Sequence, residues 1–429
     1  MTRTSFPAES GAAAFLNADA FLKDFQRTAD FGATPNQGID RQAGTAEHGA
    51  VRDWFAQKAE RRGFSVKTDP IGNIFALKEF VPGEPYILLG SHLDSQPQGG
   101  RFDGAYGVIA AFHAALAVEK AVEAGLVPSR FNLAVVDWFN EEGARFGPSI
   151  MGSSVYTGAL QLEEALNVRD ADGISVRSAL RDTGRLGEPV EFHTAVCVEI
   201  HIEQGRRLER SGAHVGIVER NWTAQKLLVH VRGEQAHAGA LLADRRDALL
   251  AAAEVVTAAH REAHRHRADE FITSVAKFDV HPNSPSVIAR QVDLLLDVRG
   301  LYQKDVESAR SSLIAEFGEI SKNHNVDVDV EEFTIRPSQP YTAAGVELAE
   351  QVAHEEGLTP QRLTTLIGHD SVALNRIYPT VMLFVPSADG ISHCEREFSS
   401  DSDMLNGLRL VTGLVSRLVQ HGILDEGAE

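Results

Sequence analysis

The residues of this chain that are best suited to chemistry begin in the stretch GSHLDSQPQGGRFDG, at positions 90–104. It places His92, Asp94 and Asp103 shortly after the apolar run YILL, which is typical of a buried strand. Imidazole and carboxylate groups can bind a divalent metal ion or transfer protons. Because such groups need partners or a ligand when they follow a buried strand, this stretch is the first candidate site.

Three further predicted strands end in similar polar groups. These strands lie in the segments LAVVDWFN, AVCVEIHIEQG and VMLFVPSADGIS. The polar residues at or after their ends are Glu141, Glu142, Glu199, His201, Glu203, Gln204, His393, Glu395 and Glu397. Ligands of open α/β sheets bind outside the carboxyl ends of the strands. We therefore expect the four segments to bring imidazole and carboxylate groups together at one edge of a sheet.

The chemical types of these residues favour a catalytic metal site. Imidazole and carboxylate ligands without an obvious thiolate suit Zn, Mn, Co or Ni rather than a cysteine-rich structural zinc. The set exceeds the needs of one ion, so we expect two divalent ions per chain that share a carboxylate and together hold a substrate and a water. Asp94, two residues after His92, is expected to orient that imidazole.

Each element taken alone also has an ordinary structural explanation. His201 could be a core histidine with satisfied hydrogen bonds, and the sequence NEEG around Glu141 could be a solvated loop. Cys394, beside His393, is expected to be a small buried thiol. The sequence HREAHRH at 260–266 lacks the spacing of zinc peptidase motifs and is expected to be a solvated helix face. The convergence of four segments is what favours a metal site.

The order of predicted elements indicates an α/β fold with two domains. Strands and helices alternate up to residue 214, which predicts a mostly parallel sheet covered on both faces. Residues 215–331 have the predicted order β-α-β-β-α-β, a ferredoxin-like unit inserted into the first domain. We expect residues 1–214 and 332–429 to form the catalytic metal-binding domain. The inserted unit offers a sheet edge and helices for self-pairing, which predicts a homodimer.

Composition and net charge limit the binding partners and the cellular compartment that we expect for this protein. The chain has 429 residues and a net charge of -19, so nucleic acid and anionic membranes are not expected partners. A small substrate that carries a carboxylate would need a dedicated cation in so acidic a protein. Two cysteines make no disulfide framework, and no uninterrupted run reaches about eighteen apolar residues. We therefore expect a cytoplasmic protein.

Six motifs then carry a resemblance to a known family. They are GSHLDSQPQGGRFDGAYGV, FNEEGARF, EIHIEQG, GEQAHAG, GHDS and GISHCEREF, in this order. The set resembles the hydantoinase/carbamoylase branch of dinuclear-zinc amidohydrolases, which holds N-carbamoyl-L-amino-acid hydrolases, β-ureidopropionases and allantoate amidohydrolases. The resemblance extends from about GATPNQGIDR to the last helix. It implies a metal-dependent hydrolase of the C–N bond of N-carbamoyl amino acids or related ureido and N-acyl acids, with residues 215–331 as a lid and dimerisation domain.

The resemblance also implies the metal-binding and catalytic roles. The implied metal ligands are His92, Asp103, Glu142, His201 and His393. Asp103 would bridge two ions, the first of which is completed by His92 and His201 and the second by Glu142 and His393. Glu141 would act as the general base toward the metal-held water.

The implied substrate contacts lie in both domains. His237 in GEQAHAG would stabilise the developing oxyanion, from its own chain or from the partner of a dimer. Gln204 and Gly390 would contact the substrate, and Arg299 would pair with a substrate carboxylate. Ser286 stands where the family often has an asparagine, which indicates a roomier pocket.

The sequence leaves three alternatives open, one to the role of Arg299 and two to the function. An internal ion pair of Arg299 with Asp297 or Asp293 would leave this arginine without a role in recognition. An aminoacylase or dipeptidase would use similar metal chemistry, although the motifs HIEQG and NEEGARF match the carbamoylase branch. A non-catalytic binding protein could retain the fold, but the ligands and Glu141 are all present.

Overall fold

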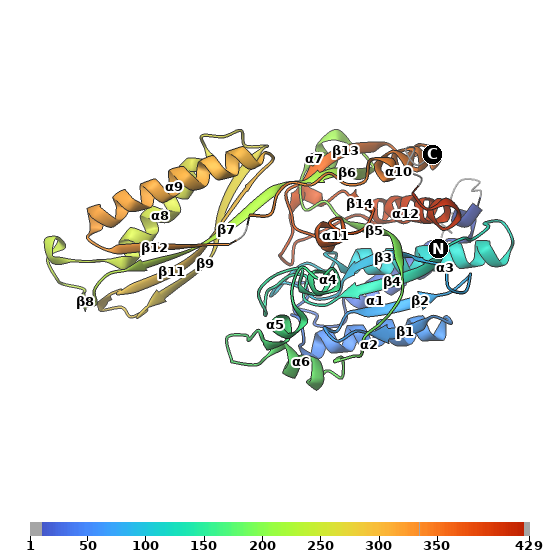
Figure 1. Cartoon of the computed structure of the whole chain (residues 1–429), viewed down its shortest axis with the longest axis horizontal. Helices are drawn as coiled ribbons and strands as arrows, with labels where there is room; N and C mark the ends of the chain where they lie inside the picture. Colours follow the sequence, from blue (N-terminus) through green and yellow to red (C-terminus); the bar gives the residue numbers. More distant parts are fainter. Residues whose placement is uncertain (1–10, 334, 424–429) are drawn as a thin grey trace. The chain divides into compact units, whose positions relative to one another are not determined.

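The computed structural model describes residues 11–333 and 335–423, and the chain divides into two compact units (Figure 1). Among the described residues, the first unit holds those up to Glu219, Tyr341–Leu363 and those from Gly368 onward. The second unit holds Arg220–Pro340 and Thr364–Ile367. The chain therefore leaves the first unit and returns to it, with a further short excursion at Thr364–Ile367.

The first unit is built on an eight-stranded sheet in the order β1-β2-β4-β3-β5-β14-β6-β13. Its strands are β1 (Ser65–Thr68), β2 (Ile74–Lys78), β3 (Tyr86–His92), β4 (Asn132–Trp138), β5 (Thr194–Ile202), β6 (Val215–Asn221), β13 (Pro360–Thr365) and β14 (Thr380–Val385). The central strands β4, β3, β5 and β14 run parallel, whereas β2 and β6 run antiparallel to their neighbours β4 and β14. The predicted α/β fold with a large, mostly parallel sheet is therefore confirmed for the centre of the sheet.

Helices cover both faces of this sheet. The helices of the first unit are α1 (Ala18–Thr28), α2 (Ala46–Arg61), α3 (Ala105–Glu123), α4 (Met151–Tyr156), α5 (Leu162–Asn167), α6 (Val176–Asp182), α7 (Arg207–Ser211), α10 (Ala343–Glu355), α11 (Asp370–Leu374) and α12 (Asp401–His421). Helices α3 and α12 pack on each other and on β3 and β5. On the opposite face, Leu374 of α11 packs with Leu88 and Cys197. Apolar strands buried on both faces are typical of this architecture, and every residue of β4 is buried.

Helix α3 is long and apolar enough to cross a membrane by length and composition alone. However, 83% of its most apolar window is buried inside the structure. It packs against α1, α12, β3 and β5, so its apolar side chains form the centre of the largest hydrophobic cluster. The sequence prediction considered only uninterrupted apolar runs. Helix α3 shows that a buried core helix with few charges can also have the length and the mean hydropathy of a membrane span.

The second unit pairs a four-stranded sheet with two helices. Its strands β7 (Thr223–Arg232), β9 (Phe271–His281), β11 (Gln291–Gly300) and β12 (Asp327–Glu332) are antiparallel in the order β12-β7-β11-β9. Helices α8 (Ala248–Ala263) and α9 (Gln303–His324) pack on β7 and β11. The chain order is thus the expected β-α-β-β-α-β, with β8 (Ala236–His237) and β10 (Val287–Ile288) forming an additional small pair.

The boundaries of the second unit differ from the predicted 215–331. Strand β6 pairs with β14 of the large sheet, so residues 215–219 belong to the first unit. The second unit extends to Pro340 because Arg336 forms a bridge with Ala224 of β7. It also takes in Thr364–Ile367, where the carbonyl of Thr365 accepts the backbone N–H of Trp222.

Candidate metal centre

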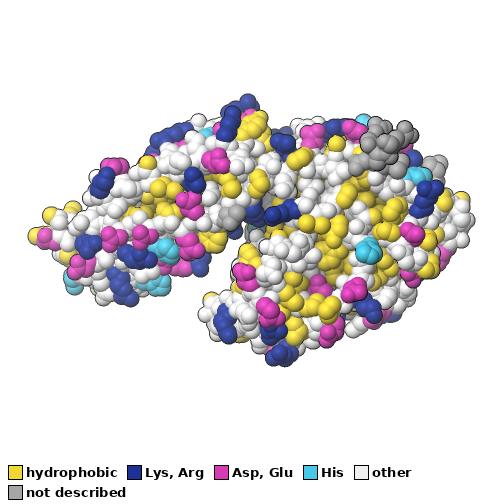
Figure 2. Space-filling model, viewed as in Figure 1, with side chains coloured by type: hydrophobic (Ala, Val, Ile, Leu, Met, Phe, Trp, Pro, Cys, Tyr) yellow, Lys and Arg dark blue, Asp and Glu magenta, His cyan; other side chains and the backbone are white. Residues whose placement is uncertain are grey.

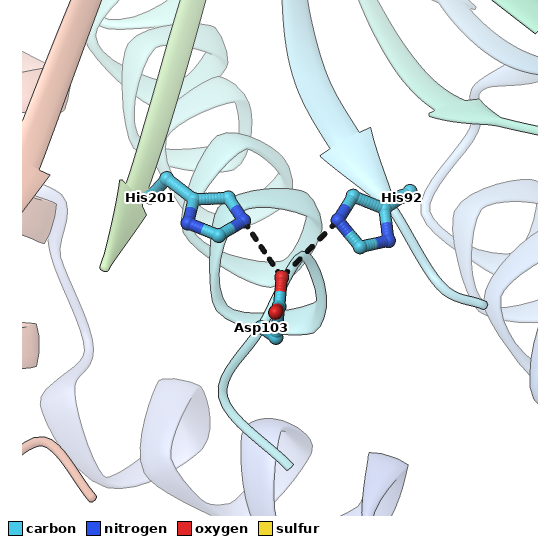
Figure 3. A group of neighbouring side chains, drawn as sticks. All are labelled: His92, Asp103 and His201. Carbon is cyan, nitrogen blue, oxygen red and sulfur yellow. Dashed lines mark ion pairs between the residues drawn. The ribbon is translucent and has the colours of Figure 1, made fainter. Parts of the chain in front are cut away.

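Two histidines from neighbouring parallel strands meet one carboxylate (Figure 3). His92 ends β3, His201 lies near the end of β5, and Asp103 lies in the loop that precedes α3. The Nε2 atoms of His92 and His201 lie 3.3 and 3.0 Å from Oδ1 of Asp103. All three side chains are buried, so this group is a compact imidazole–carboxylate cluster at the carboxyl ends of the strands.

Hydrogen bonds to the far side of each ring fix how the two histidines face Asp103. Nδ1 of His92 lies 3.1 Å from the carbonyl oxygen of Asp94, and Nδ1 of His201 lies 3.0 Å from that of Ile202. A carbonyl only accepts, so each Nδ1 carries the proton, and in a neutral ring Nε2 keeps its lone pair. This is the arrangement in which a histidine binds a metal through Nε2.

A second group shares Asp103. Nε2 of His393 lies 3.2 Å from Oδ2 of Asp103 and 3.5 Å from Oε2 of Glu142. The Gln96 side chain donates to Oε2 of Glu142 at 2.8 Å. The amide nitrogen of Gln204 donates to Oδ2 of Asp103 at 2.8 Å. The two oxygens of Asp103 thus face different groups, as a carboxylate that bridges two ions requires.

The residues present fit divalent ions. Ligand atoms held about 2.0–2.2 Å from one ion keep roughly 3–3.5 Å between them. The distances of 3.0–3.5 Å from Asp103 and Glu142 to the three histidines lie in this range. The donor set is nitrogen and carboxylate oxygen, which suits the borderline transition metals.

Electrostatics also favour positive charge in this cluster. Burial lowers the pKa of His92, but Glu141 and Asp103 outweigh it and raise the pKa well above its usual value. Burial likewise lowers the pKa of His393, and Asp103 and Glu142 raise it overall to about 9. The carboxylates therefore attract a cation to the position between these residues, whether a proton or a metal ion.

Local backbone geometry positions these candidate ligands. Gly104 has φ +64°, and a Cβ atom there would lie 2.4 Å from Cε1 of His92, so a larger residue would displace the ring. The Asp94 carboxylate accepts the backbone N–H groups of Glu141 and Glu142 at 3.2 and 3.3 Å. Asp94 thus links the loop after β3 to the loop after β4, and its Oδ1 lies 3.5 Å from Nδ1 of His92.

Glu141 lies beside the first group without belonging to it. Its Oε2 is 3.6 Å from Nε2 of His92, and its Oε1 is buried with no partner among the described residues. Burial raises the pKa of Glu141 well above its usual value, and Asp370 and Glu142 raise it further against the opposite effect of His92. A buried carboxyl group with one unpaired oxygen is able to accept a proton from a ligand.

Gly390 and Gln204 lie close together in the first unit. Gly390 belongs to the short 3-10 helix η3 (Ala388–Gly390) and has φ +63°. A Cβ atom at Gly390 would lie 2.8 Å from the backbone carbon of Gly205, which follows Gln204. The structure therefore brings Gln204 to Asp103 and places Gly390 next to the Gln204 loop.

The remaining predicted site residues lie in the second unit. His237 is exposed on β8, and its Nδ1 accepts the N–H of Gly239 at 2.9 Å. His237 pairs with Val287, so Ser286 lies beside it at the surface. The guanidinium of Arg299 donates to Asp297 at 2.6 Å and to the carbonyl of Leu366 at 2.8 Å. The internal ion pair considered as an alternative is therefore present.

The structure adds a carboxylate to which the sequence assigned no separate role. Glu397 is 4% exposed, and its Oε1 accepts the backbone N–H groups of Phe102 and Asp103 at 2.9 and 3.0 Å. Its Oε2 accepts the hydroxyl of Ser392 at 2.6 Å. Burial raises the pKa of Glu397 to about 7. Glu397 thus connects the loop of Asp103 to the loop of His393.

A buried histidine also joins this region. The His369 ring, from the GHDS motif, lies 4.6 Å from the His201 ring between centroids. Its Nε2 has no hydrogen-bond partner among the described residues. The motif itself was visible in the sequence, but a single histidine after a glycine gave no indication that it would pack on His201.

Comparisons with known proteins agree with this geometry. Residues 88–417 match Peptidase family M20/M25/M40. The chain is 46% identical to a putative hydrolase of Mycolicibacterium smegmatis, over 95% of this chain and 94% of the relative. It is 33% identical to an N-carbamoyl-L-amino acid amidohydrolase of Geobacillus stearothermophilus, over 94% and 99%. It is 31% identical to an allantoate amidohydrolase of Bacillus subtilis, over 91% and 95%.

A solved structure extends the likeness to three dimensions. An amidase of the hydantoinase/carbamoylase family from Burkholderia vietnamiensis has a TM-score of 0.91 and 30% identity, covering 97% of this chain and 100% of that chain. The predicted resemblance is confirmed, and so is the predicted class of enzyme, because relatives are amidohydrolases. The chain belongs to Peptidase family M20/M25/M40, and it is similar to solved amidases of the hydantoinase/carbamoylase family.

Proposed function

We propose that this protein is a metal-dependent hydrolase of the C–N bond in N-carbamoyl amino acids or related ureido acids. The observation that carries the proposal is the position of Asp103 between two groups of ligands, with Glu141 beside them. The names of the relatives support ureido compounds as the substrate class. Amide and ureido carbonyls are poor electrophiles, so their hydrolysis needs the kind of assistance that such a centre supplies.

Different residues would bind the metal ions, transfer the proton and position the loops. The proposed ligands of two divalent ions are His92, Asp103, His201, Glu142 and His393. When bound, such ions polarise a carbonyl and make a water more acidic. Glu141 would accept the proton of the attacking water at its carboxylate and return it to the departing nitrogen. Asp94 would hold the loops of His92, Glu141 and Glu142 in place.

We propose that the second unit is a lid and a dimerisation domain that completes the substrate site. His237 would stabilise the oxyanion, and Arg299 would bind a substrate carboxylate together with Gln204 and Gly390. Ser286, beside His237, would leave more room than the asparagine frequent in the family. The partners would be a second copy of the chain and a small substrate that carries a carboxylate. Both cysteines are free thiols, which supports a reducing compartment such as the cytoplasm.

A substrate panel tests the proposal. Ammonia release is measured with N-carbamoyl-β-alanine, allantoate and a series of N-carbamoyl-L-amino acids, in the presence of Mn or Zn. Release of free amino acids from N-acetyl amino acids and dipeptides, whose hydrolysis yields no ammonia, serves as the comparison for an aminoacylase or a dipeptidase. Hydrolysis of at least one ureido acid, lost on chelation and restored by metal, supports the proposal. Full activity in metal-free protein, or turnover of dipeptides alone, contradicts it.

Glu141→Gln provides the matched variant. It keeps the size of the side chain and should retain fold and metals, but should lower kcat by roughly 10²–10⁴-fold because the amide cannot accept the proton. Circular dichroism and metal analysis serve as controls. Near-normal kcat in this variant would assign the general base to another group.

A further inference from the structure

Two exposed histidines lie side by side at the end of helix α8 in the second unit. His260 lies in the last turn of α8, and His264 is the residue directly after the helix, with helical φ and ψ of -71° and -9°. Residues four positions apart on a helix are neighbours on its surface. The Nε2 atoms of the two rings are 3.1 Å apart, and the ring planes are nearly perpendicular, at 88°. The helix thus brings two nitrogen ligands to one point of the surface.

These two histidines differ from others of the same unit in their partners. Three other histidines lie within 3.4 Å of a carboxylate, namely His230 with Asp293, His266 with Glu262 and His324 with Glu254. Figure 2 shows histidine side chains at the surface of this unit among Lys, Arg, Asp and Glu. His260 and His264 instead contact each other, and both are exposed. Their rings are therefore accessible to a ligand from solution.

The electrostatic surroundings of the pair are compatible with a bound cation. Arg261 binds the carboxylate of Glu316, which lies in α9. Arg265 binds the carboxylate of Glu262. The positive charges of the two neighbouring arginines are therefore matched by carboxylates. The C-terminal end of a helix carries a partial negative charge, so a metal ion at the end of the 16-residue helix α8 is favoured rather than repelled.

The distance between the two nitrogen atoms suits ligands of one metal ion. Imidazole nitrogen lies about 2.0–2.1 Å from a bound zinc ion. Two such nitrogens are about 2.9 Å apart when they meet the ion at a right angle, and about 3.3 Å apart at the tetrahedral angle. The observed 3.1 Å lies between these values. A hydrogen bond between two imidazoles leaves one Nε2 with a free lone pair, and the other ring binds through Nε2 once its proton is on Nδ1.

The pair has no general base beside it of the kind found in zinc peptidases. In the motif H-E-x-x-H, two histidines on one helix face bind zinc, and the glutamate after the first histidine is the base. Arg261 stands at that position in this chain. The next residue, Glu262, is buried and binds Arg265. We therefore expect this pair to bind a metal ion without hydrolysing a substrate.

We propose that His260 and His264 together bind one divalent transition-metal ion at the surface of the second unit. A site with imidazole ligands binds copper most tightly and manganese least, with nickel and zinc between them. Because both rings are exposed, water occupies the other positions around the ion. This ion is additional to those proposed at Asp103. The inference does not rest on the proposed function, and it stands even if the protein hydrolyses no ureido acid.

Retention on immobilised nickel distinguishes the pair from the buried centre. Protein without an affinity tag is loaded with zinc, applied to a nickel resin and eluted with an imidazole gradient. The rings of His92 and His201 are buried and cannot reach an ion on the resin. The wild type should be retained, whereas His260→Ala and His264→Ala should each elute at clearly lower imidazole. His281→Ala removes another exposed histidine of the same unit, and it should elute with the wild type.

Electron paramagnetic resonance of added Cu(II) measures the affinity and identifies the ligands. Zinc-loaded wild type should bind one Cu(II) per chain, with hyperfine coupling to two imidazole nitrogens. Each single variant should weaken this binding by about 10²-fold, because two linked ligands bind more tightly than one. Circular dichroism checks that both variants keep the fold. Equal resin retention and equal copper affinity in the wild type and both variants overturn the inference. Loss of binding in only one of the two variants also overturns it, because a single histidine then holds the ion.

Discussion

Replacement of Glu397 by alanine tests how Asp103, the proposed shared ligand, is held. One oxygen of Glu397 accepts the backbone N–H groups of Phe102 and Asp103, both buried. Each buried N–H left without an acceptor costs about 1–3 kcal/mol, so the two together cost about 2–6 kcal/mol. The Ser392 hydroxyl also loses its partner, but it is only partly buried and can turn toward water. We expect the free energy of unfolding of metal-free protein to fall by about 2–6 kcal/mol.

The same change should weaken metal binding, because the loop that carries Asp103 loses its anchor. The measurements are urea unfolding of metal-free protein and metal content after dialysis against a weak chelator. Glu397→Gln keeps an oxygen that can accept both N–H groups. It should therefore recover most of the stability and lose only about 1 kcal/mol, the difference between a charged and a neutral acceptor.

Glu395→Ala is the matched control from the same loop. Glu395 binds the side chains of Thr34 and Asn36, which lie outside both ligand groups. Asn36 is exposed and can exchange Glu395 for water, so this variant should retain its metals and lose about 1 kcal/mol. Unfolding of Glu397→Ala within about 1 kcal/mol of wild type, with full metal content, would refute the reasoning.

Two further predictions concern the ions and the assembly. Metal uptake by metal-free protein at pH 7 should release at least one proton per chain, because the pKa of His393 is about 9 and its ring must be neutral to bind. The proton from His393 should no longer contribute well above this pKa. Calorimetry in buffers of different ionisation enthalpy measures the release, and no release at pH 7 would contradict the assignment of His393. Mixed dimers of Glu141→Gln and His237→Ala chains should regain activity, because His237 is exposed on the unit proposed to form the dimer. No recovery in verified mixed dimers would place His237 in the site of its own chain.

The convergence of the proposed metal ligands could be predicted because it depends on strand direction. The apolar runs before His92 and around His201 form neighbouring parallel strands, so their polar ends must lie at one edge of the sheet. The apolar segment between Gly104 and Gly125 forms the helix α3, as its composition and its glycine boundaries indicate. The ion pair of Arg299 with Asp297 was foreseen as an alternative because residues two apart on a strand share a face.

The role of Glu397 could not be read from the sequence. It accepts the backbone N–H groups of Phe102 and Asp103, which lie 295 and 294 positions earlier in the chain. Because every residue type except proline has a backbone N–H group, the sequence does not show which of them a distant carboxylate will bind. The predicted start of the second unit at residue 215 was too early for a similar reason. Only the pairing of β6 with β14, and not the composition of β6, shows that this strand belongs to the large sheet.

The buried carboxylates explain why this centre would require cations. Burial and the nearby charge of Asp103 together raise the pKa of Glu142 and of Glu397 to about 7, so negative charges crowd one small region. Carboxylates so close together and out of water destabilise the fold unless positive charge lies between them. Protonated histidines can supply part of that charge, as the raised pKa of His393 shows. Two divalent ions would supply more charge without leaving the histidines protonated, and the tethers from Asp94 and Glu397 to the ligand loops would keep the carboxylates in place to receive them.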